Sequence, residues 1–328
     1  MRVLIVLPGA LGDVVRALPL LGRLRRAWPQ AWIAWAVEPL SAPLLKGHPW
    51  LDETLVFARQ RGLRAFVPFL ARVRRGRFDL ALDLGRGAKS ALIARASAAP
   101  ERLGFGRRDG REGGWLLATR RLPPQDPARP KLEHFLAFGD ALGLPPAPVA
   151  FGLTPTPAEA EEAAALTAAL PRPLVAACVG SSCPSRLWFP ERTAALLDQL
   201  GTGAVLLGTA ADAAFAAAVL RAMRGRARDL VGRTTLRQLL AVLACADVAV
   251  GPDSGALHLA AAVGTRVVSL WGATSARRSA PFGSERFTVA GEAPCAPCFL
   301  RHCPIDRVCM QAISVAAVHT RVVEALAA

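Results

Sequence analysis

Three side chains that can bind an anion or move a proton occur close together, at Asp253, Ser254 and His258. A short run at 247–250 precedes them and is typical of a buried parallel strand, while residues 256–263 form a helical pattern that stops at a glycine. Asp253 or Ser254 can cap this helix, whose free N–H groups and positive dipole end attract anions. Two interpretations stay open here. Either the group is an anion site, or Asp253 only caps the helix and His258 only fills space beside the sheet.

A second buried strand is predicted at 266–271, and it ends in a polar turn that contains Thr274. The two predicted strands therefore both end in polar residues, one at Asp253 and the other at Thr274. Open α/β sheets bind their ligands at the carboxyl ends of neighbouring strands. The pattern thus predicts a ligand site at this edge of a sheet.

The stretch Asp-Ser-Gly-x-x-His-Leu-Ala-Ala-Ala from Asp253, continued by Val-Val-x-Leu-Trp-Gly-x-Thr up to Thr274, resembles the donor-site signature of glycosyltransferase family 9, the lipopolysaccharide heptosyltransferases. The resemblance extends over nearly the whole chain. It implies that Asp253, Ser254, Gly255 and His258 hold the diphosphate of an ADP-sugar, with Thr274 among the donor-binding residues.

Asp13 follows the first apolar run in the pattern Gly-x-x-Gly-Asp, which allows a tight strand-to-helix turn. This spacing is not a dinucleotide fingerprint, and a carboxylate there would repel a pyrophosphate. Asp13 can accept a proton from a hydroxyl, or it can serve as a helix cap. In the family that this motif resembles, the Asp is the proposed catalytic base, and Gly-Asp-x-x-x-x-Leu-Pro is intact through Pro19.

The loop 180–188 follows a predicted buried strand at 174–179. By resemblance, Arg186 stands where the family has a Lys that binds the donor phosphates; Arg keeps the charge with a different geometry. Arg186 could instead stack on Trp188. The family often places an acidic residue near Asp212 for nucleotide contact, so Asp212 is a ribose or adenine candidate.

The acceptor side is predicted from basic residues in the first half of the chain. Lys89, Arg111 and His134 resemble acceptor-side positions of heptosyltransferases, and Arg59 and Arg61 are added as basic neighbours. The family pattern usually has Gln where this chain has Arg86. The alternative is that these basic side chains are ordinary solvated charges.

Net charge is +15, and it is concentrated in the first half of the sequence. Residues 1–150 contain 24 Lys and Arg against 12 Asp and Glu, whereas residues 151–328 contain 16 against 13. Such a field suits anionic lipid headgroups or a phosphorylated substrate. No nucleic-acid motif accompanies it, and a solvated basic surface is the alternative.

Strands that alternate with helices predict an α/β fold with doubly wound parallel sheets. The remaining strands are predicted at 1–7, 31–37, 55–57, 78–83 and 204–208, and residues 230–236 are predicted as a strand entering a helix. A proline-rich stretch at 145–157 reads as a linker between two domains. We therefore expect an acceptor-binding Rossmann-like domain at 1–152 and a donor-binding one at 153–328, facing across a cleft in the GT-B arrangement. A last helix at 314–328 can pack on either domain.

Four of the seven cysteines, Cys295, Cys298, Cys303 and Cys309, have the spacing C-x2-C-x4-C-x5-C. The spacing resembles a metal site, although zinc sites usually pair two C-x2-C knuckles. A structural metal, a disulfide and free thiols all stay open. No metal or other cofactor is expected to be required for the reaction, whose substrate is an ADP-sugar.

Together the resemblance and the residues predict an inverting, metal-independent transfer of heptose from ADP-heptose to the lipopolysaccharide inner core. The alternatives are another donor or acceptor within the same family, a nucleotide-sugar 2-epimerase, and a silent sugar-nucleotide binding protein. No apolar run is long enough to cross a bilayer, and the first residues lack the features of a signal peptide. We expect a cytoplasmic monomer held at the inner membrane by electrostatics.

Overall fold

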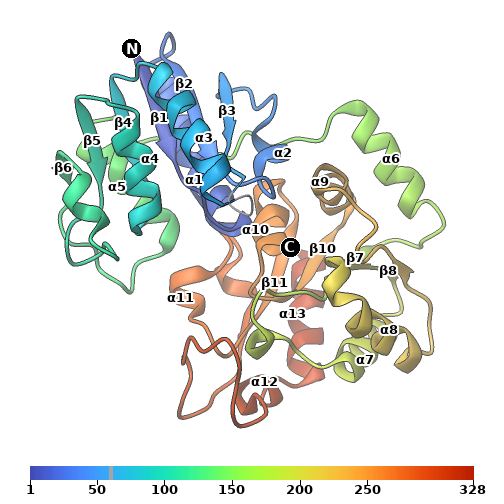
Figure 1. The fold of residues 1–328 in the computed structure, drawn as a ribbon. Coiled ribbons are helices and arrows are strands. Elements are labelled where there is room, and N and C mark those ends of the chain that lie inside the picture. Colours follow the sequence, from blue (N-terminus) through green and yellow to red (C-terminus); the bar gives the residue numbers. More distant parts are fainter. Residues whose placement is uncertain (59–61) are drawn as a thin grey trace. The chain divides into compact units, whose positions relative to one another are not determined.

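The computed structural model describes residues 1–58 and 62–328. The chain divides into two compact units, Met1–Leu153 and Thr154–Ala328, and each has its own hydrophobic core. The division lies one residue from the boundary expected between 152 and 153. Each unit is a six-stranded parallel sheet with helices on both faces (Figure 1).

The first unit contains β1 to β6 in the spatial order β3-β2-β1-β4-β5-β6. Its strands are β1 (Arg2–Val6), β2 (Trp32–Val37), β3 (Glu53–Val56), β4 (Leu80–Asp83), β5 (Glu101–Gly104) and β6 (Arg120–Arg121). Its helices are α1 (Leu11–Ala27), α2 (Ala42–Leu45), α3 (Leu63–Arg75), α4 (Ala88–Ala96), the 3-10 helix η2 (Gly114–Leu117) and α5 (Lys131–Ala141).

The centre of this sheet is β1, whose side chains from Val3 to Val6 are fully buried. The strand is an uninterrupted apolar run because helices cover both faces of a parallel sheet. Helix α1 packs against α5, and α3 packs against α4 on the other face. Strands β2 and β4 flank β1 in parallel, so the loops after β1 and β4 leave the sheet side by side.

The second unit repeats the plan with the order β12-β11-β10-β7-β8-β9. Its strands are β7 (Leu174–Cys178), β8 (Gly203–Leu207), β9 (Arg228–Asp229), β10 (Val248–Pro252), β11 (Arg266–Trp271) and β12 (Thr288–Ala290). Its helices are α6 (Pro157–Thr167), η3 (Pro184–Arg186), α7 (Pro190–Leu200), η4 (Ala210–Asp212), α8 (Ala213–Ala222), α9 (Leu236–Cys245), α10 (Gly255–Ala262), α11 (Ala276–Ser279), η5 (Glu285–Phe287), α12 (Val308–Gln311) and α13 (Val315–Ala327).

Both sheets have the Rossmann strand order, in which the direction of winding reverses between two central strands. These strands are β1 and β4 in the first unit, and β7 and β10 in the second. Ligands of such sheets bind beyond the carboxyl ends of the strands at this reversal. The topology therefore selects the loops after β1, β4, β7 and β10 as the places to look for a site.

Two expectations about the second unit are settled by these elements. Residues 230–236 were predicted as a strand entering a helix; the strand is wrong and the helix is confirmed. Strand β9 is only Arg228–Asp229, Gly232 turns the chain with a φ of 70°, and Thr235 caps α9, which begins at Leu236. Helix α13 packs on α7 and β11 of its own unit, where Val318, Val322 and Ala325 are buried. Among the described residues no helix is long and apolar enough to cross a membrane.

Candidate active site

Asp13 lies in the first turn of α1, just beyond the carboxyl end of β1. It does not cap this helix, because Ala10 occupies the N-cap position and no side chain makes a cap hydrogen bond there. Its Oδ1 accepts hydrogen bonds from Arg16 Nη1 at 2.9 Å and from Lys131 Nζ at 3.4 Å. Asp13 is therefore a partly buried carboxylate, 31% exposed, between two cations.

The electrostatic surroundings of Asp13 act in opposite directions on its pKa. Burial raises the pKa, but the positive charges of Lys131 and Arg16 and their hydrogen bonds lower it by more, so it lies below its ordinary value. The group is consequently ionised at neutral pH. An ionised carboxylate is the form that can accept a proton from a hydroxyl.

The loop after β4 brings a second carboxyl and an arginine to the same edge of the sheet. Asp83, the last residue of β4, pairs in register with Val6 of β1 and accepts a hydrogen bond from the Gly85 N–H. Burial raises the pKa of Asp83 to about 7, against the opposing effect of its Ser90 and Gly85 hydrogen bonds. Asp83 and Arg86 line one small pocket with Trp115.

The predicted acceptor residues that the structure describes differ in their burial and contacts. His134 is buried, and its Nδ1 accepts a hydrogen bond from Arg86 Nη2 at 2.7 Å while its Nε2 donates to the Asp126 carbonyl at 3.0 Å. Lys89 is half-buried in α4, with Nζ 6.0 Å from the Phe57 ring. Arg111 is exposed and its N–H donates to the Arg86 carbonyl. Two further predicted residues, Arg59 and Arg61, lie outside the described residues.

In the second unit the loops after β7, β10 and β11 meet at Asp253. Its Oδ2 contacts Arg186 Nη1 at 3.1 Å and accepts a hydrogen bond from Thr274 Oγ1 at 2.9 Å. The Ser181 hydroxyl donates to the Asp253 carbonyl at 2.9 Å. The carboxylate therefore connects three loops and fixes the guanidinium of Arg186.

Two buried polar atoms at this point have no hydrogen-bond partner, Ser254 Oγ and Arg186 Nε. Ser254 is the N-cap residue of α10, yet its side chain makes no cap hydrogen bond. Gly255 is the first helical residue, and His258, one turn on, is buried. Buried polar groups are normally satisfied, so unsatisfied donors beside a helix N-terminus are groups that an anionic ligand could satisfy.

Asp212 lies beside the same sheet edge but makes local hydrogen bonds. Its Oδ2 accepts from both the N–H and the hydroxyl of Thr209, each at 2.8 Å, which closes η4. The carboxylate packs against Gly180, where no Cβ would fit, so it borders the loop that leads from β7 to Arg186. Asp212 is thus held in place at the predicted nucleotide side of the site.

A family model for glycosyltransferase family 9 (heptosyltransferase) matches residues 68–309, which is most of the chain. The chain belongs to this family. It is therefore a glycosyltransferase. Its curated relatives include lipopolysaccharide core heptosyltransferase OpsX of Haemophilus influenzae, 25% identical over 84% of this chain and 80% of the relative. Lipopolysaccharide heptosyltransferase 2 of Salmonella typhimurium is 28% identical over 84% of both chains.

Solved structures share the fold of this glycosyltransferase. ADP-heptose lipopolysaccharide heptosyltransferase II of E. coli superposes with a TM-score of 0.81 at 23% identity over 100% of this chain and 99% of that one. A family 9 glycosyltransferase from Veillonella parvula reaches 0.84 at 19% identity, over 99% and 97%. The fold class is GT-B, as expected. The iron-containing glycosyltransferase TibC of E. coli is more distant, with a TM-score of 0.60 at 17% identity over 99% of this chain and 75% of TibC.

The cysteine motif of the glycosyltransferase lies around α12. All seven cysteines are free thiols, and among the described residues no three His, Cys, Asp or Glu side chains are grouped so that they could hold a metal ion. Cys309 is buried, and its burial is the main reason why its pKa is raised. Cys295, in contrast, is exposed. Cys303 Sγ accepts a hydrogen bond from the Arg307 N–H at 3.2 Å.

Several residues of the glycosyltransferase site were not predicted. Arg16 could have been found, because it lies three positions after Asp13 in a predicted helix, where side chains meet. Lys131 could not have been predicted from the sequence, since it reaches Asp13 only through the packing of α5 on α1. Asp83 and the Arg86–His134 pair likewise depend on the order of the strands. No sequence signal identifies those contacts.

Proposed function

We propose that this glycosyltransferase moves a heptose from ADP-heptose to the inner core of lipopolysaccharide, with inversion at the anomeric carbon and without a metal ion. The observation that carries the proposal is the pair of buried, unpartnered polar atoms, Ser254 Oγ and Arg186 Nε, at the N-terminus of α10. The choice of sugar and acceptor is supported by curated relatives named lipopolysaccharide heptosyltransferases.

On the donor side, the diphosphate would accept hydrogen bonds from Arg186, the Ser254 hydroxyl and the first N–H groups of α10, with His258 beside it. Negative charge grows on the leaving diphosphate as the bond to the sugar breaks, and fixed donors stabilise that charge without reorganisation. A carboxylate is a poor partner for a phosphate, so Asp253 would orient Arg186 and accept from a sugar hydroxyl. Thr274 would hold Asp253, and Asp212 would border the nucleoside.

On the acceptor side, Asp13 would remove the proton from a hydroxyl whose oxygen attacks the anomeric carbon from the face opposite the diphosphate. The new C–O bond forms as the bond to the diphosphate breaks, and the electron pair leaves on the phosphate oxygen. Lys131 would keep Asp13 ionised. Lys89 and Arg111, with Arg59 and Arg61, would contact the acidic acceptor, and His134 would act through Arg86.

The attachment to the membrane belongs to the same proposal. A lipid-linked acceptor is presented at an anionic bilayer surface, and the 1–150 half carries 24 basic against 12 acidic residues. Clustered basic residues bind such surfaces at about 1 kcal/mol each. We therefore infer electrostatic, peripheral binding of a monomer at the cytoplasmic face of the inner membrane.

The test is the substitution Asp13→Asn, assayed with ADP-heptose and a lipid A–Kdo acceptor. We expect kcat to fall by at least about 100-fold, since general bases contribute roughly that much or more. Binding of ADP, followed by thermal shift, should stay unchanged. Asp140→Asn is the matched control, because Asp140 is an exposed carboxylate of the same unit that, like Asp13, pairs with an arginine of α1 (Arg23, at 2.9 Å), and its turnover should stay within about twofold of wild type.

Two results would contradict the proposal. Turnover of Asp13→Asn within about threefold of wild type would remove Asp13 as the base, because a lost general base costs far more. Consumption of ADP-heptose by the wild type without any acceptor would instead indicate an epimerase or a hydrolase.

A further inference from the structure

A groove lined by arginines lies beside β6, at the edge of the sheet in the first unit. Its volume is about 630 Å³, and its walls include Arg107, Arg108, Arg121 and Leu122. Arg107 and Arg108 lie in the turn after β5, which closes through hydrogen bonds from the N–H groups of Asp109 and Gly110 to the Gly106 carbonyl. Because it follows β5 and β6, the groove opens at the same carboxyl edge of the sheet as Asp13.

Two of these arginines lie against the ring of Trp115. The guanidinium carbons of Arg107 and Arg121 lie 5.7 and 5.3 Å from the centre of its ring. Arg121 is also fixed by a hydrogen bond from its Nε to the Trp115 carbonyl at 3.0 Å. Cation–π contacts offset part of the repulsion between the two guanidinium groups but neutralise neither of them.

The carboxylate of the groove does not neutralise the arginines either. Asp109 Oδ2 accepts a hydrogen bond from the Gln125 N–H at 2.9 Å, and its Oδ1 lies 4.0 Å from Arg86 Nη1. Within residues 1–58 and 62–328, no ion pair joins Arg107, Arg108 or Arg121 to a carboxylate. Three guanidinium groups that repel one another in one concave surface favour the binding of a dianion.

We propose that this arginine groove binds a phosphate group on the acceptor glycan, away from the hydroxyl that is attacked. The inference rests on the proposed function, since it assumes a glycan acceptor. Guanidinium groups pair with phosphate oxygens through two parallel hydrogen bonds, which gives both affinity and orientation. Pro124, which is exposed in the lining of the groove, offers apolar surface on which a sugar ring can rest. Arg86, 4.0 Å from Asp109, connects the groove to the pocket at Asp83.

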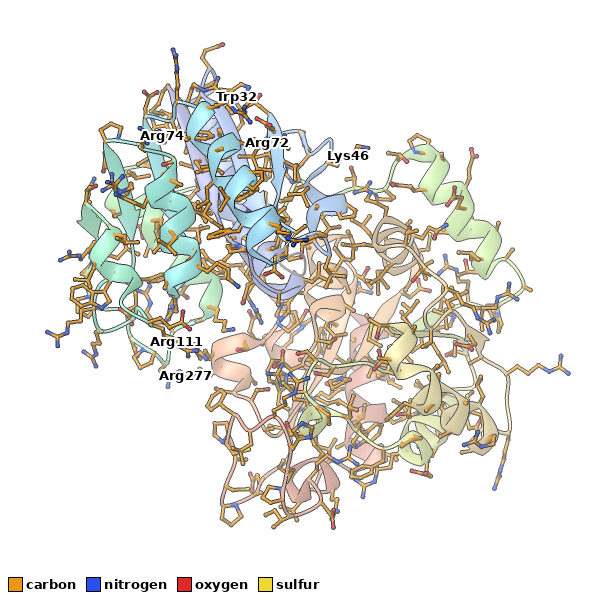
Figure 2. The ribbon with its side chains drawn as sticks, in the orientation of Figure 1. Trp32, Lys46, Arg72, Arg74, Arg111 and Arg277 are labelled. Carbon is orange, nitrogen blue, oxygen red and sulfur yellow. The ribbon has the colours of Figure 1, made fainter. Side chains whose placement is uncertain are left out.

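The test compares two double variants with the same change of charge. Arg107→Gln/Arg108→Gln removes two groove cations that make no ion pair, so the fold should be retained. Arg74→Gln/Arg75→Gln is the matched control, because both side chains are exposed in the last turn of α3. Within this unit, Figure 2 shows Arg74 near the start of the strands and Arg111 at the opposite end.

The measurement is equilibrium binding of a glucosamine disaccharide that carries phosphate monoesters, and of its dephosphorylated form, by calorimetry without donor. The wild type should prefer the phosphorylated form. Arg107→Gln/Arg108→Gln should weaken its binding about tenfold, the equivalent of one to two charge-assisted contacts. The dephosphorylated form should bind all proteins alike, and Arg74→Gln/Arg75→Gln should stay within about twofold of wild type.

Three results of the calorimetry would overturn the groove assignment. The first is that both double variants bind the phosphorylated disaccharide equally weakly. The second is that the groove variant loses affinity for both disaccharides to the same extent. The third is that the wild type binds the phosphorylated and dephosphorylated forms equally well. Sedimentation with anionic phospholipid vesicles that lack the glycan forms the other arm. If the groove variant loses vesicle binding but keeps the disaccharide, the groove takes bilayer phosphates and the inference fails. Disaccharide binding is measured without sugar transfer. A failure of heptose transfer would therefore refute the proposed function, while the binding data would still test the groove.

Discussion

At the scale of single residues, the site depends on what surrounds Asp13. A general base must be ionised, and the charges of Lys131 and Arg16 secure this by lowering its pKa although burial raises it. The same charges make the carboxylate a weaker base. As the proposed base, Asp13 would need a hydroxyl whose own acidity rises as it attacks, which fits a base that acts late in the transfer.

Lys131→Met removes the larger of the two positive influences on Asp13. The pKa of Asp13 should rise, because burial is then opposed by Arg16 alone. A base with a higher pKa becomes ionised only at higher pH, so the acid limb of kcat/KM against pH should move upward. Lys46→Met is the control, since Lys46 is exposed on the same unit (Figure 2). An acid limb at the same pH in both variants would show that Lys131 does not tune Asp13.

At the scale of elements, the sequence predicted long apolar strands and missed short polar ones. The strands β10 and β11 and helix α10 lie within two residues of their predicted bounds, because each has a clear apolar pattern. Strands β6 and β9 have two residues each, Arg120–Arg121 and Arg228–Asp229, and both lie at sheet edges. Edge strands are polar, and their pairing is decided by neighbours that are distant in sequence.

Helix α6 packs on α9, and the carboxylate of Glu159 makes polar contacts between the two helices. Glu159 accepts hydrogen bonds from Arg237 of α9 at 2.7 and 2.5 Å and forms a capping box with Thr156. The side-chain hydrogen bonds of Arg237 outweigh the effect of burial and lower the pKa of Glu159 to about 2. A lowered pKa means that the folded state favours the carboxylate. Its contribution to stability is present above about pH 4.5 and is lost as the pH falls toward 2.

Glu159→Gln should therefore lower the free energy of unfolding by about 1 kcal/mol at pH 7, a value limited by partial exposure of the pair. The difference from wild type should shrink as the pH falls from about 4.5 toward 2, and urea unfolding at several pH values measures it. Glu161→Gln, an exposed neighbour on α6, should change the stability by under about 0.5 kcal/mol. Equal losses in both variants would contradict a specific role for Glu159.

At the scale of the whole molecule, one strand order is used twice with different charges. Both units have the Rossmann order, yet the first 150 residues carry a net +12 and the remaining 178 a net +3. The alternation of elements and the proline-rich linker were enough to predict two domains. The contact of Asp13 with Lys131, that of Asp253 with Arg186, and the arginine groove were not predictable, because each joins segments that are distant in sequence and meet only in the folded unit.

The charge difference leads to a prediction for membrane binding. Attachment to vesicles that contain anionic lipid and acceptor should weaken steeply between 50 and 500 mM salt, since the screening length falls about threefold over this range. Reversing Arg64, Arg74 and Arg75 of α3 to Glu lowers the net charge of residues 1–150 from +12 to +6 and should reduce the bound fraction at low salt. Binding of ADP should change little, because the proposed donor residues belong to Thr154–Ala328. Zwitterionic vesicles serve as the control in sedimentation. A bound fraction that is equal at both salt concentrations would show that the basic surface is only solvated charge and does not guide the protein to the membrane.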